Sequence, residues 1–221
     1  MKIIYWSDFN CPNSYIGLNR IRQAASELNL DFEWELKAFE LEPASDIKPA
    51  VSALERYAVK YGLTLKEAEK EIDEIESIAE SEGLNINYKT TKITSSRSAH
   101  RLVKYAQKKE PSLAQDLIEK IFEANFSKNQ IISDEKLLTE IACEVGLDGK
   151  EVEKVLKSNS YDIEVDLDEE DARFNGLYSI PFYLIIINEE QLSVPGAFEK
   201  EDFKIAMKDL LSGEIRYKSF I

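Results

Sequence analysis

The period of the hydrophobic pattern changes twice along the chain. A short apolar run at residues 3–6 predicts a buried strand, and residues 12–28 then repeat their apolar positions with helical spacing. Residues 31–39 alternate between apolar and polar side chains, which predicts a second strand. Because a strand, a helix and a strand follow one another, we expect a βαβ unit in which the two strands are parallel.

Between about Pro43 and Gly176 the apolar positions keep a helical period. The pattern predicts helices over residues 51–61, 64–79, 96–109, 112–125, 133–146, 149–158 and 161–175. Thr64 and Glu67 have the spacing of a capping box at the start of the second of these helices. The acidic run 162–171 lacks the central glycine and final glutamate of a calcium-binding EF-hand loop. We expect this run to form the solvated face and first turn of the last helix.

A strand pattern returns near the C-terminus. Residues 181–187 are continuously apolar, as in a strand that is covered on both faces. Residues 188–190 are expected to form a turn, after which residues 191–194 pair back as a hairpin. A final amphipathic helix is expected over residues 199–211. Periodicity alone therefore predicts a mixed α/β protein with a helical middle.

The chain has 221 residues and a formal net charge of −14. This acidic balance argues against a nucleic-acid surface, which needs clustered lysine and arginine side chains. No apolar stretch approaches the roughly 20 residues that cross a bilayer, and the N-terminus lacks a basic segment followed by an apolar leader. We therefore expect no nucleic-acid partner, no membrane partner and a cytoplasmic location.

Only two cysteines are present, Cys11 and Cys143, and they are far apart in the sequence. This usage is typical of a reducing compartment rather than of a secreted fold held by disulfides. Together with a single histidine they provide no metal-ligand spacing, so no metal is expected. Cys143 is interpreted as a bystander on the outer face of its helix, with the alternative that it serves as a remote resolving thiol.

Cys11 lies where the first strand turns into the first helix, with Pro12 just inside the first helical turn. Unpaired backbone N–H groups and the positive end of the helix dipole favour a thiolate there, so we expect a lowered pKa and a reactive thiol. The Ser14 hydroxyl can donate a hydrogen bond to this thiolate. Asn10, Pro12 and Asn13 surround the sulfur in the sequence and are candidate contacts for a substrate backbone or for glutathione.

Several segments resemble one known family. Residues 8–17, DFNCPNSYIG, resemble the D-x-x-C-P-W-C-Y-I-G motif of the FrnE-like group in the DsbA-like branch of the thioredoxin superfamily. Residues 95–101, SSRSAHR, are similar to that group's N-[ST]-x-x-A-H-R. Residues 180–183 and 194–198, IPFY and VPGAF, resemble its V-P-F-F and V-S-G-A-Q. The matches follow the family order and span nearly the whole chain.

This resemblance implies an α/β fold in which an all-helical insertion interrupts a thioredoxin-like domain. The implied boundaries are residues 1–43 and 177–221 for the thioredoxin-like domain and residues 44–176 for the insertion domain. The resemblance also implies a cis Ile180–Pro181 bond facing the nucleophile, where the Ile180 backbone can pair with an extended substrate. His100, in the second matched segment, is expected close to the cleft as a contact rather than as a proton-transfer group.

The chain departs from the family motif at Ser14, which stands in place of the second cysteine. With Cys11 as the one thiol of the motif, the implied activity is thiol–disulfide exchange or isomerisation through a mixed disulfide. An outside thiol such as glutathione would release that intermediate. The implied substrate is a thiol or disulfide, either a peptide or a glutathione adduct, with glutathione as a possible co-substrate and no resident cofactor.

Two other interpretations stay open. Kappa-class glutathione transferases and 2-hydroxychromene-2-carboxylate isomerases share the implied fold and insertion, so a glutathione-dependent isomerase or transferase is one alternative. Those enzymes carry serine at the nucleophile-side position of the motif, whereas Ser14 occupies the other position. The second alternative is a non-catalytic peptide-binding module that has kept the cleft. A homodimer is compatible with any of the three.

Overall fold

A computed structural model describes residues 1–43 and 51–213. The chain divides into two compact units, Met1–Phe39 with Asp168–Ile221, and Glu40–Leu167. The second division falls inside helix α8 (Asp162–Phe174), earlier than the boundary implied by the resemblance. Asp168 belongs with the first unit because its carboxylate accepts the Ala38 N–H at 2.8 Å and its carbonyl oxygen accepts the Trp6 indole N–H at 3.2 Å.

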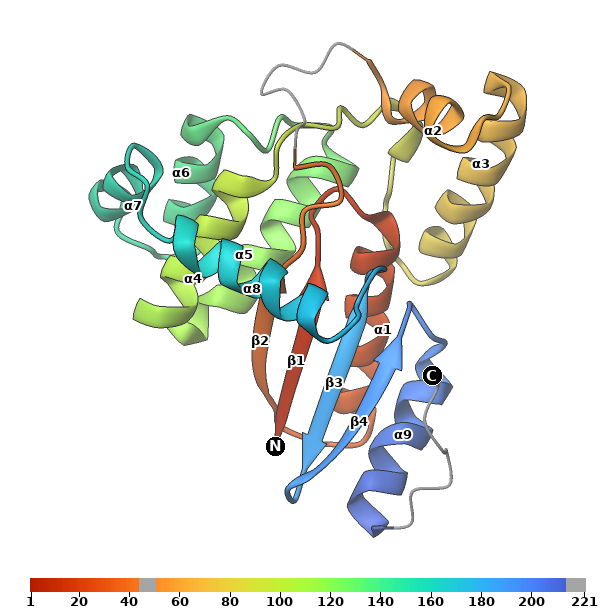
Figure 1. The fold of residues 1–221 in the computed structure, drawn as a ribbon, viewed down its shortest axis with the longest axis vertical. Helices are drawn as coiled ribbons and strands as arrows, with labels where there is room; N and C mark the ends of the chain where they lie inside the picture. Colours follow the sequence, from red (N-terminus) through yellow and green to blue (C-terminus); the bar gives the residue numbers. More distant parts are fainter. Residues whose placement is uncertain (44–50, 214–221) are drawn as a thin grey trace. The chain divides into compact units, whose positions relative to one another are not determined.

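The first unit contains a four-stranded sheet in the order β2-β1-β3-β4 (Figure 1). Its elements are β1 (Lys2–Ser7), α1 (Pro12–Glu27), β2 (Glu33–Ala38), β3 (Phe182–Ile187), β4 (Glu190–Pro195) and α9 (Lys200–Ser212). Strands β1 and β2 are parallel, whereas β3 pairs antiparallel with both β1 and β4. The βαβ unit and the C-terminal hairpin predicted from the sequence are therefore confirmed.

The two faces of this sheet are covered by different helices. Tyr183 on β3 packs edge-to-face against Phe203 of α9, with ring centroids 5.2 Å apart, and its hydroxyl lies against Gly17 of α1. On the opposite face, Trp6 forms a cluster with Ala172 of α8 and with Leu177. Alternate residues of β3 face these two layers, so its continuously apolar sequence follows from having a helix on each side.

The second unit is helical. Its helices are α2 (Ala53–Tyr61), α3 (Leu65–Ser81), α4 (Arg97–Lys109), α5 (Pro111–Phe122), α6 (Glu135–Glu144), α7 (Gly149–Leu156) and the first part of α8, with a short 3₁₀ turn at Tyr88–Thr90. The predicted capping box is confirmed, because Thr64 and Glu67 bond each other's backbone N–H groups at the start of α3. The helix predicted over residues 112–125 instead ends in a π-helical turn, Glu123–Ser127.

The acidic run 162–171 differs from its predicted role as a solvated face at one position, and several of its members form specific contacts. Asp168 is buried and accepts the β2 backbone N–H described above, and Asp171 forms an ion pair with Lys37 of β2. Asp162 and Asp166 form ion pairs with Arg97, within the second unit. The expectation is wrong for Asp168, which is buried because its partners lie on β1 and β2, far away in the sequence. It holds for Asp162, in the first turn of α8, and for Asp166, which is exposed. In the described chain, no helix is long and apolar enough to cross a membrane.

Candidate active site

Cys11 is the N-cap residue of α1, as the sequence predicts, and Pro12 occupies the first turn. A tight polar turn connects the end of β1 to Cys11. The Asp8 side chain accepts the Asn10 N–H at 3.2 Å, and the Asp8 carbonyl oxygen accepts the Cys11 N–H at 3.0 Å. The Cys11 carbonyl oxygen in turn accepts the Ser14 N–H at 3.0 Å, which begins the helix.

The expectation of a lowered pKa at Cys11 is wrong. Only 6% of the residue is exposed, and burial raises the pKa of its thiol above the ordinary value. The adjacent Ser14 side chain and the backbone N–H groups of Ser14 and Asn13 lower the pKa, whereas the nearby Asp8 carboxylate adds to the rise. Desolvation is the largest of these effects, so the helix N-terminus does not by itself make the thiol acidic.

The other predicted residues of this turn differ in exposure. Asn10, Pro12 and Ser14 are buried, whereas Asn13 is exposed. Asn13 is therefore the member of the group that a bound molecule can reach without rearrangement, while Ser14 acts directly on the sulfur.

Pro181 lies at the same edge of the sheet as Cys11. The Ile180–Pro181 peptide bond is cis. Phe182, which follows it, pairs with Trp6 near the end of β1, so the start of β3 and the turn that carries Cys11 share one edge. The Pro181 carbonyl oxygen accepts the Gly196 N–H at 2.7 Å, which ties the proline to the turn after β4. Pro181 is buried and Ile180 is half-buried.

Arg20 is a structural residue of this edge that the sequence analysis did not identify. Its guanidinium is buried, donates to the carbonyl oxygens of Ala197 and Phe198 at 2.9 and 3.3 Å, and forms an ion pair with Glu199 at 2.9 Å. Helix α1 therefore holds the segment that follows β4. The sequence places Arg20 on the apolar face of the first helix, and a buried arginine needs polar partners. This pattern could have identified Arg20 as a structural residue.

Gly17 allows α1 to approach that segment closely. A Cβ atom at this position would lie 2.5 Å from the buried Tyr183 hydroxyl oxygen and 3.2 Å from the Ala197 Cα. We expect Gly17→Ala to lower the free energy of unfolding by about 1–2 kcal/mol in urea titrations, because overpacking outweighs the gain of about 1 kcal/mol in helix propensity. Gly149→Ala is a matched control.

At Gly149 the added Cβ would lie 2.7 Å from the Cys143 sulfur, a comparable approach, but Cys143 is exposed and its side chain can move. Gly149→Ala should therefore leave stability nearly unchanged or improve it. Equal destabilisation by the two substitutions would contradict this account of Gly17.

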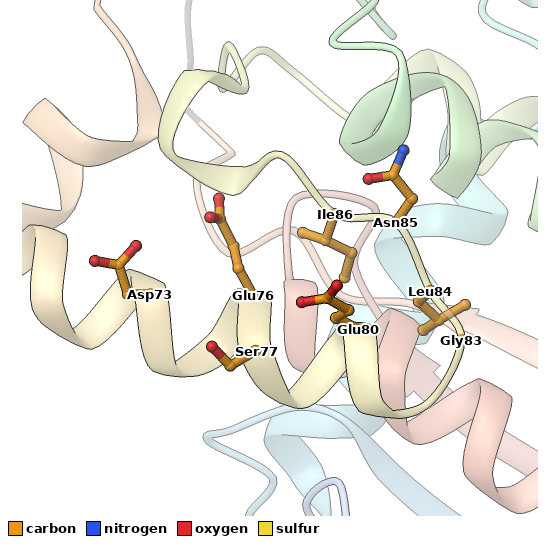
Figure 2. Close-up of a pocket in the computed structure, with 8 residues that line it drawn as sticks. All are labelled: Asp73, Glu76, Ser77, Glu80, Gly83, Leu84, Asn85 and Ile86. Atoms are coloured by element: carbon orange, nitrogen blue, oxygen red, sulfur yellow. The ribbon is translucent and has the colours of Figure 1, made fainter.

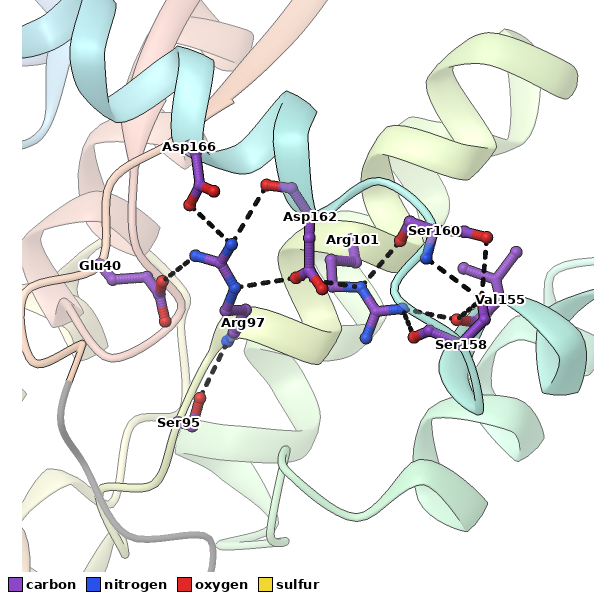
Figure 3. A network of polar contacts seen from close by, with 9 residues as sticks. All are labelled: Glu40, Ser95, Arg97, Arg101, Val155, Ser158, Ser160, Asp162 and Asp166. Carbon is purple, nitrogen blue, oxygen red and sulfur yellow. Dashed lines mark hydrogen bonds and ion pairs between the residues drawn. The ribbon is translucent and has the colours of Figure 1, made fainter.

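The second family-like segment lies in the helical unit. His100 is fully buried on α4. Arg97 and Arg101, on the same helix, form the polar network drawn in Figure 3. Arg97 donates to Glu40 at 3.1 Å, to Asp162 at 2.9 Å and to Asp166 at 2.6 Å.

Arg101, in the same network, donates hydrogen bonds to backbone carbonyl groups. Its guanidinium donates to the carbonyl oxygens of Val155 and Ser160 at 2.6 and 2.8 Å, and also to that of Ser158 (Figure 3). These carbonyl groups lie at and just beyond the end of α7, where helical partners are missing. The segment therefore contributes structural arginines to the helical unit.

A groove of about 530 Å³ in the helical unit is lined by acidic residues of α3 and by the segment after it (Figure 2). Its lining residues are Asp73, Glu76, Ser77, Glu80, Gly83, Leu84, Asn85 and Ile86. This lining includes neither a thiol nor an imidazole. Among the residues that the structure describes, no group of three histidine, cysteine or acidic side chains is arranged to hold a metal ion.

A family model described as the DSBA-like thioredoxin domain matches residues 2–208 of the chain. A probable DsbA oxidoreductase from Streptomyces coelicolor is 27% identical, with a TM-score of 0.86 over 100% of this chain and 94% of that chain. The match therefore extends over both units.

Two solved structures of lower identity share the fold. A 2-hydroxychromene-2-carboxylate isomerase is 18% identical, with a TM-score of 0.69 over 99% of this chain and 100% of that chain. The cytosolic disulfide reductase DsbM from Pseudomonas aeruginosa is 14% identical, with a TM-score of 0.66 over 96% of this chain and 99% of that chain. That reductase is also known in a structure with GSH.

Proposed function

This chain belongs to the DSBA-like thioredoxin domain family, and from that membership we propose that it is a monothiol thiol–disulfide oxidoreductase or isomerase that acts through Cys11. One observation carries the proposal. The single thiol of the motif belongs to the N-cap residue of α1, at the sheet edge that also carries Pro181, and Ser14 takes the position of a second thiol. The similarity to a probable DsbA oxidoreductase supports the reaction class.

The proposed reaction has two exchange steps. The Cys11 thiolate attacks the glutathione sulfur of a protein–glutathione disulfide, which forms a Cys11–glutathione disulfide and releases the protein thiolate. The thiolate of a second glutathione then attacks the glutathione sulfur of this intermediate, which releases oxidised glutathione and restores the Cys11 thiolate. Ser14 cannot resolve the intermediate, so an external thiol is required. Isomerisation uses two similar steps: the Cys11 thiolate attacks one sulfur of a disulfide within a substrate protein and releases the other as a thiolate. A different thiolate of the same protein then attacks the substrate sulfur of the mixed disulfide, which forms the new disulfide and restores the Cys11 thiolate.

Proposed roles follow for the other residues of the edge. The Ser14 side chain stabilises the thiolate, which partly offsets the cost of burying it. The Ile180 backbone, next to cis-Pro181, would pair with an extended substrate in β fashion. Asn13 is exposed and Asn10 lies one residue before the thiol, so both are proposed substrate contacts. His100 is fully buried in the helical unit, so it is not proposed as a contact. The monothiol motif supports the proposed use of glutathione, and the cysteine usage supports a proposed cytoplasmic location.

Intact-mass analysis after exposure to oxidised glutathione tests the proposal. We expect the Cys143→Ser chain to acquire one glutathione, on Cys11, and to lose it on addition of reduced glutathione. Because burial raises the pKa of Cys11, little thiolate is present at pH 7, and the rate should rise roughly tenfold per pH unit until pH exceeds the raised pKa. Modification of Cys11 only after denaturation would contradict the proposal.

A glutathione-dependent isomerase or transferase is the second candidate, favoured by the fold shared with a 2-hydroxychromene-2-carboxylate isomerase. Transfer of glutathione to an electrophilic aromatic compound that survives Cys11→Ser would support this candidate over the first, since Cys11 would then be dispensable.

A further inference from the structure

Two aromatic side chains that shortly precede Pro181 in the sequence are strongly exposed. Phe174, the last residue of α8, is 91% exposed, and Tyr178, in the segment that leads from α8 to β3 (Figure 1), is 84% exposed. Neither ring contacts another aromatic or cationic side chain among the described residues. Because the two residues are only four positions apart, their exposed rings are candidates for one binding surface.

The segment that carries these rings is held in place. At the end of α8, the Arg173 carbonyl oxygen accepts the Gly176 N–H at 3.1 Å and the Ala172 carbonyl oxygen accepts the Leu177 N–H at 2.9 Å. Leu177 is buried against Trp6, directly before Tyr178. The aromatic residues are therefore presented on either side of an anchored, buried leucine.

A carboxylate without an ion pair lies beside the first ring. Glu170 is exposed one helical turn before Phe174 and forms no ion pair with the described residues. By contrast, Arg173 is paired with Glu169 at 3.7 Å, and Asp171 is paired with β2 as described above. A carboxylate next to exposed aromatic faces suits a cationic group, which both attract.

We infer that Glu170, Phe174 and Tyr178 form an aromatic–acidic surface that binds a basic, apolar stretch of peptide beside the substrate's cysteine. This inference rests on the proposed function. Tyr178 is separated from cis-Pro181 by only Ser179 and Ile180, at the edge that carries Cys11, so a peptide paired at Ile180 continues onto this surface.

The negative charge of Glu170 favours a basic peptide over two other occupants, a second copy of the chain and glutathione. A second copy of the chain also carries a net charge of −14, so its approach to an acidic surface is disfavoured. Glutathione is itself anionic and gains nothing from Glu170. The surface therefore selects protein or peptide disulfides that have lysine or arginine near the cysteine.

Direct binding to the full-length Cys11→Ser chain tests this inference without exchange chemistry. Fluorescence anisotropy would compare two labelled peptides of equal length, with the cysteine flanked by lysine and leucine in one and by glutamate and leucine in the other. We expect the basic peptide to bind about tenfold more tightly, since cation–π and ion-pair contacts each contribute a few-fold. Phe174→Ala/Tyr178→Ala should remove this preference, and Glu170→Gln should reduce it.

Tyr61→Ala is the matched control, because Tyr61 is an exposed tyrosine of the helical unit and its loss should leave both affinities unchanged. Equal affinities for the two peptides, or an unchanged preference in the double variant, would overturn the inference. Conversion of a dimer to a monomer by the double variant in sedimentation experiments would assign the surface to a second copy and also overturn it. If the proposed function fails, Cys11 will form no glutathione adduct. That measurement does not depend on Glu170, Phe174 or Tyr178, so the two failures can be told apart.

Discussion

Replacement of Cys11 by serine is expected to reduce the turnover of a glutathionylated peptide to the uncatalysed rate, a loss of at least about a hundredfold. Under the proposed mechanism every transferred glutathione passes through a disulfide to the Cys11 sulfur, and a serine hydroxyl cannot form that bond. Release of glutathione, measured at constant pH in a coupled assay, gives the rate directly.

The fold should tolerate this substitution. Serine is slightly smaller than cysteine, and it is among the preferred residues at a helix N-cap, the position that Cys11 occupies. The urea midpoint of Cys11→Ser should therefore stay close to that of the unmodified chain, so that lost activity reports lost chemistry.

Cys143→Ser is the matched control for this experiment. Cys143 is exposed in the helical unit, and its replacement should leave the rate within about twofold. Full activity in Cys11→Ser would exclude the monothiol mechanism. Activity lost in both variants would instead assign Cys143 the role of a resolving thiol.

Replacement of Arg97 by methionine is expected to lower the free energy of unfolding by about 2–4 kcal/mol. Arg97 contacts three carboxylates, and one of them, Glu40, has only 2% of its side chain exposed. The variant removes the cation while leaving that buried carboxylate in place, which costs more than the loss of an exposed ion pair. Urea titrations at pH 7 measure the effect.

A double-mutant cycle separates this ion pair from the loss of packing. Glu40→Gln in the Arg97→Met background should recover part of the lost stability, because it removes a buried negative charge that Arg97 no longer offsets. We expect a coupling energy of at least about 1 kcal/mol between the two positions. Additive effects would mean that Arg97 stabilises the helical unit through Asp162 and Asp166 rather than through Glu40.

The sequence predicts the local structure around Cys11 well, because local rules govern it. Strand periodicity ends at residue 7, a polar turn follows, and Pro12 can occupy only the first turn of a helix, which leaves Cys11 as the N-cap. The capping box at Thr64 and the C-terminal hairpin depend on equally short spacings. Each involves residues within a few positions of one another.

The acidity of Cys11 follows a different rule. The sequence places the thiol at a helix N-terminus, which favours the thiolate, but the direction of the pKa shift depends on how much water reaches the sulfur. That is decided by the packing of side chains around the N-terminus of α1. No local pattern in the sequence reports it.

By itself, the sequence therefore determined the order of the elements, the two-part α/β organisation that the family resemblance implies, and the one thiol of the active-site motif. Only the tertiary structure decided the raised pKa of that thiol and the partners of buried charges. Arg20 reaches the backbone of Ala197 and Phe198, and Asp168 reaches that of Ala38. Such contacts join residues more than a hundred positions apart, and they form only once the helices and the sheet have packed together.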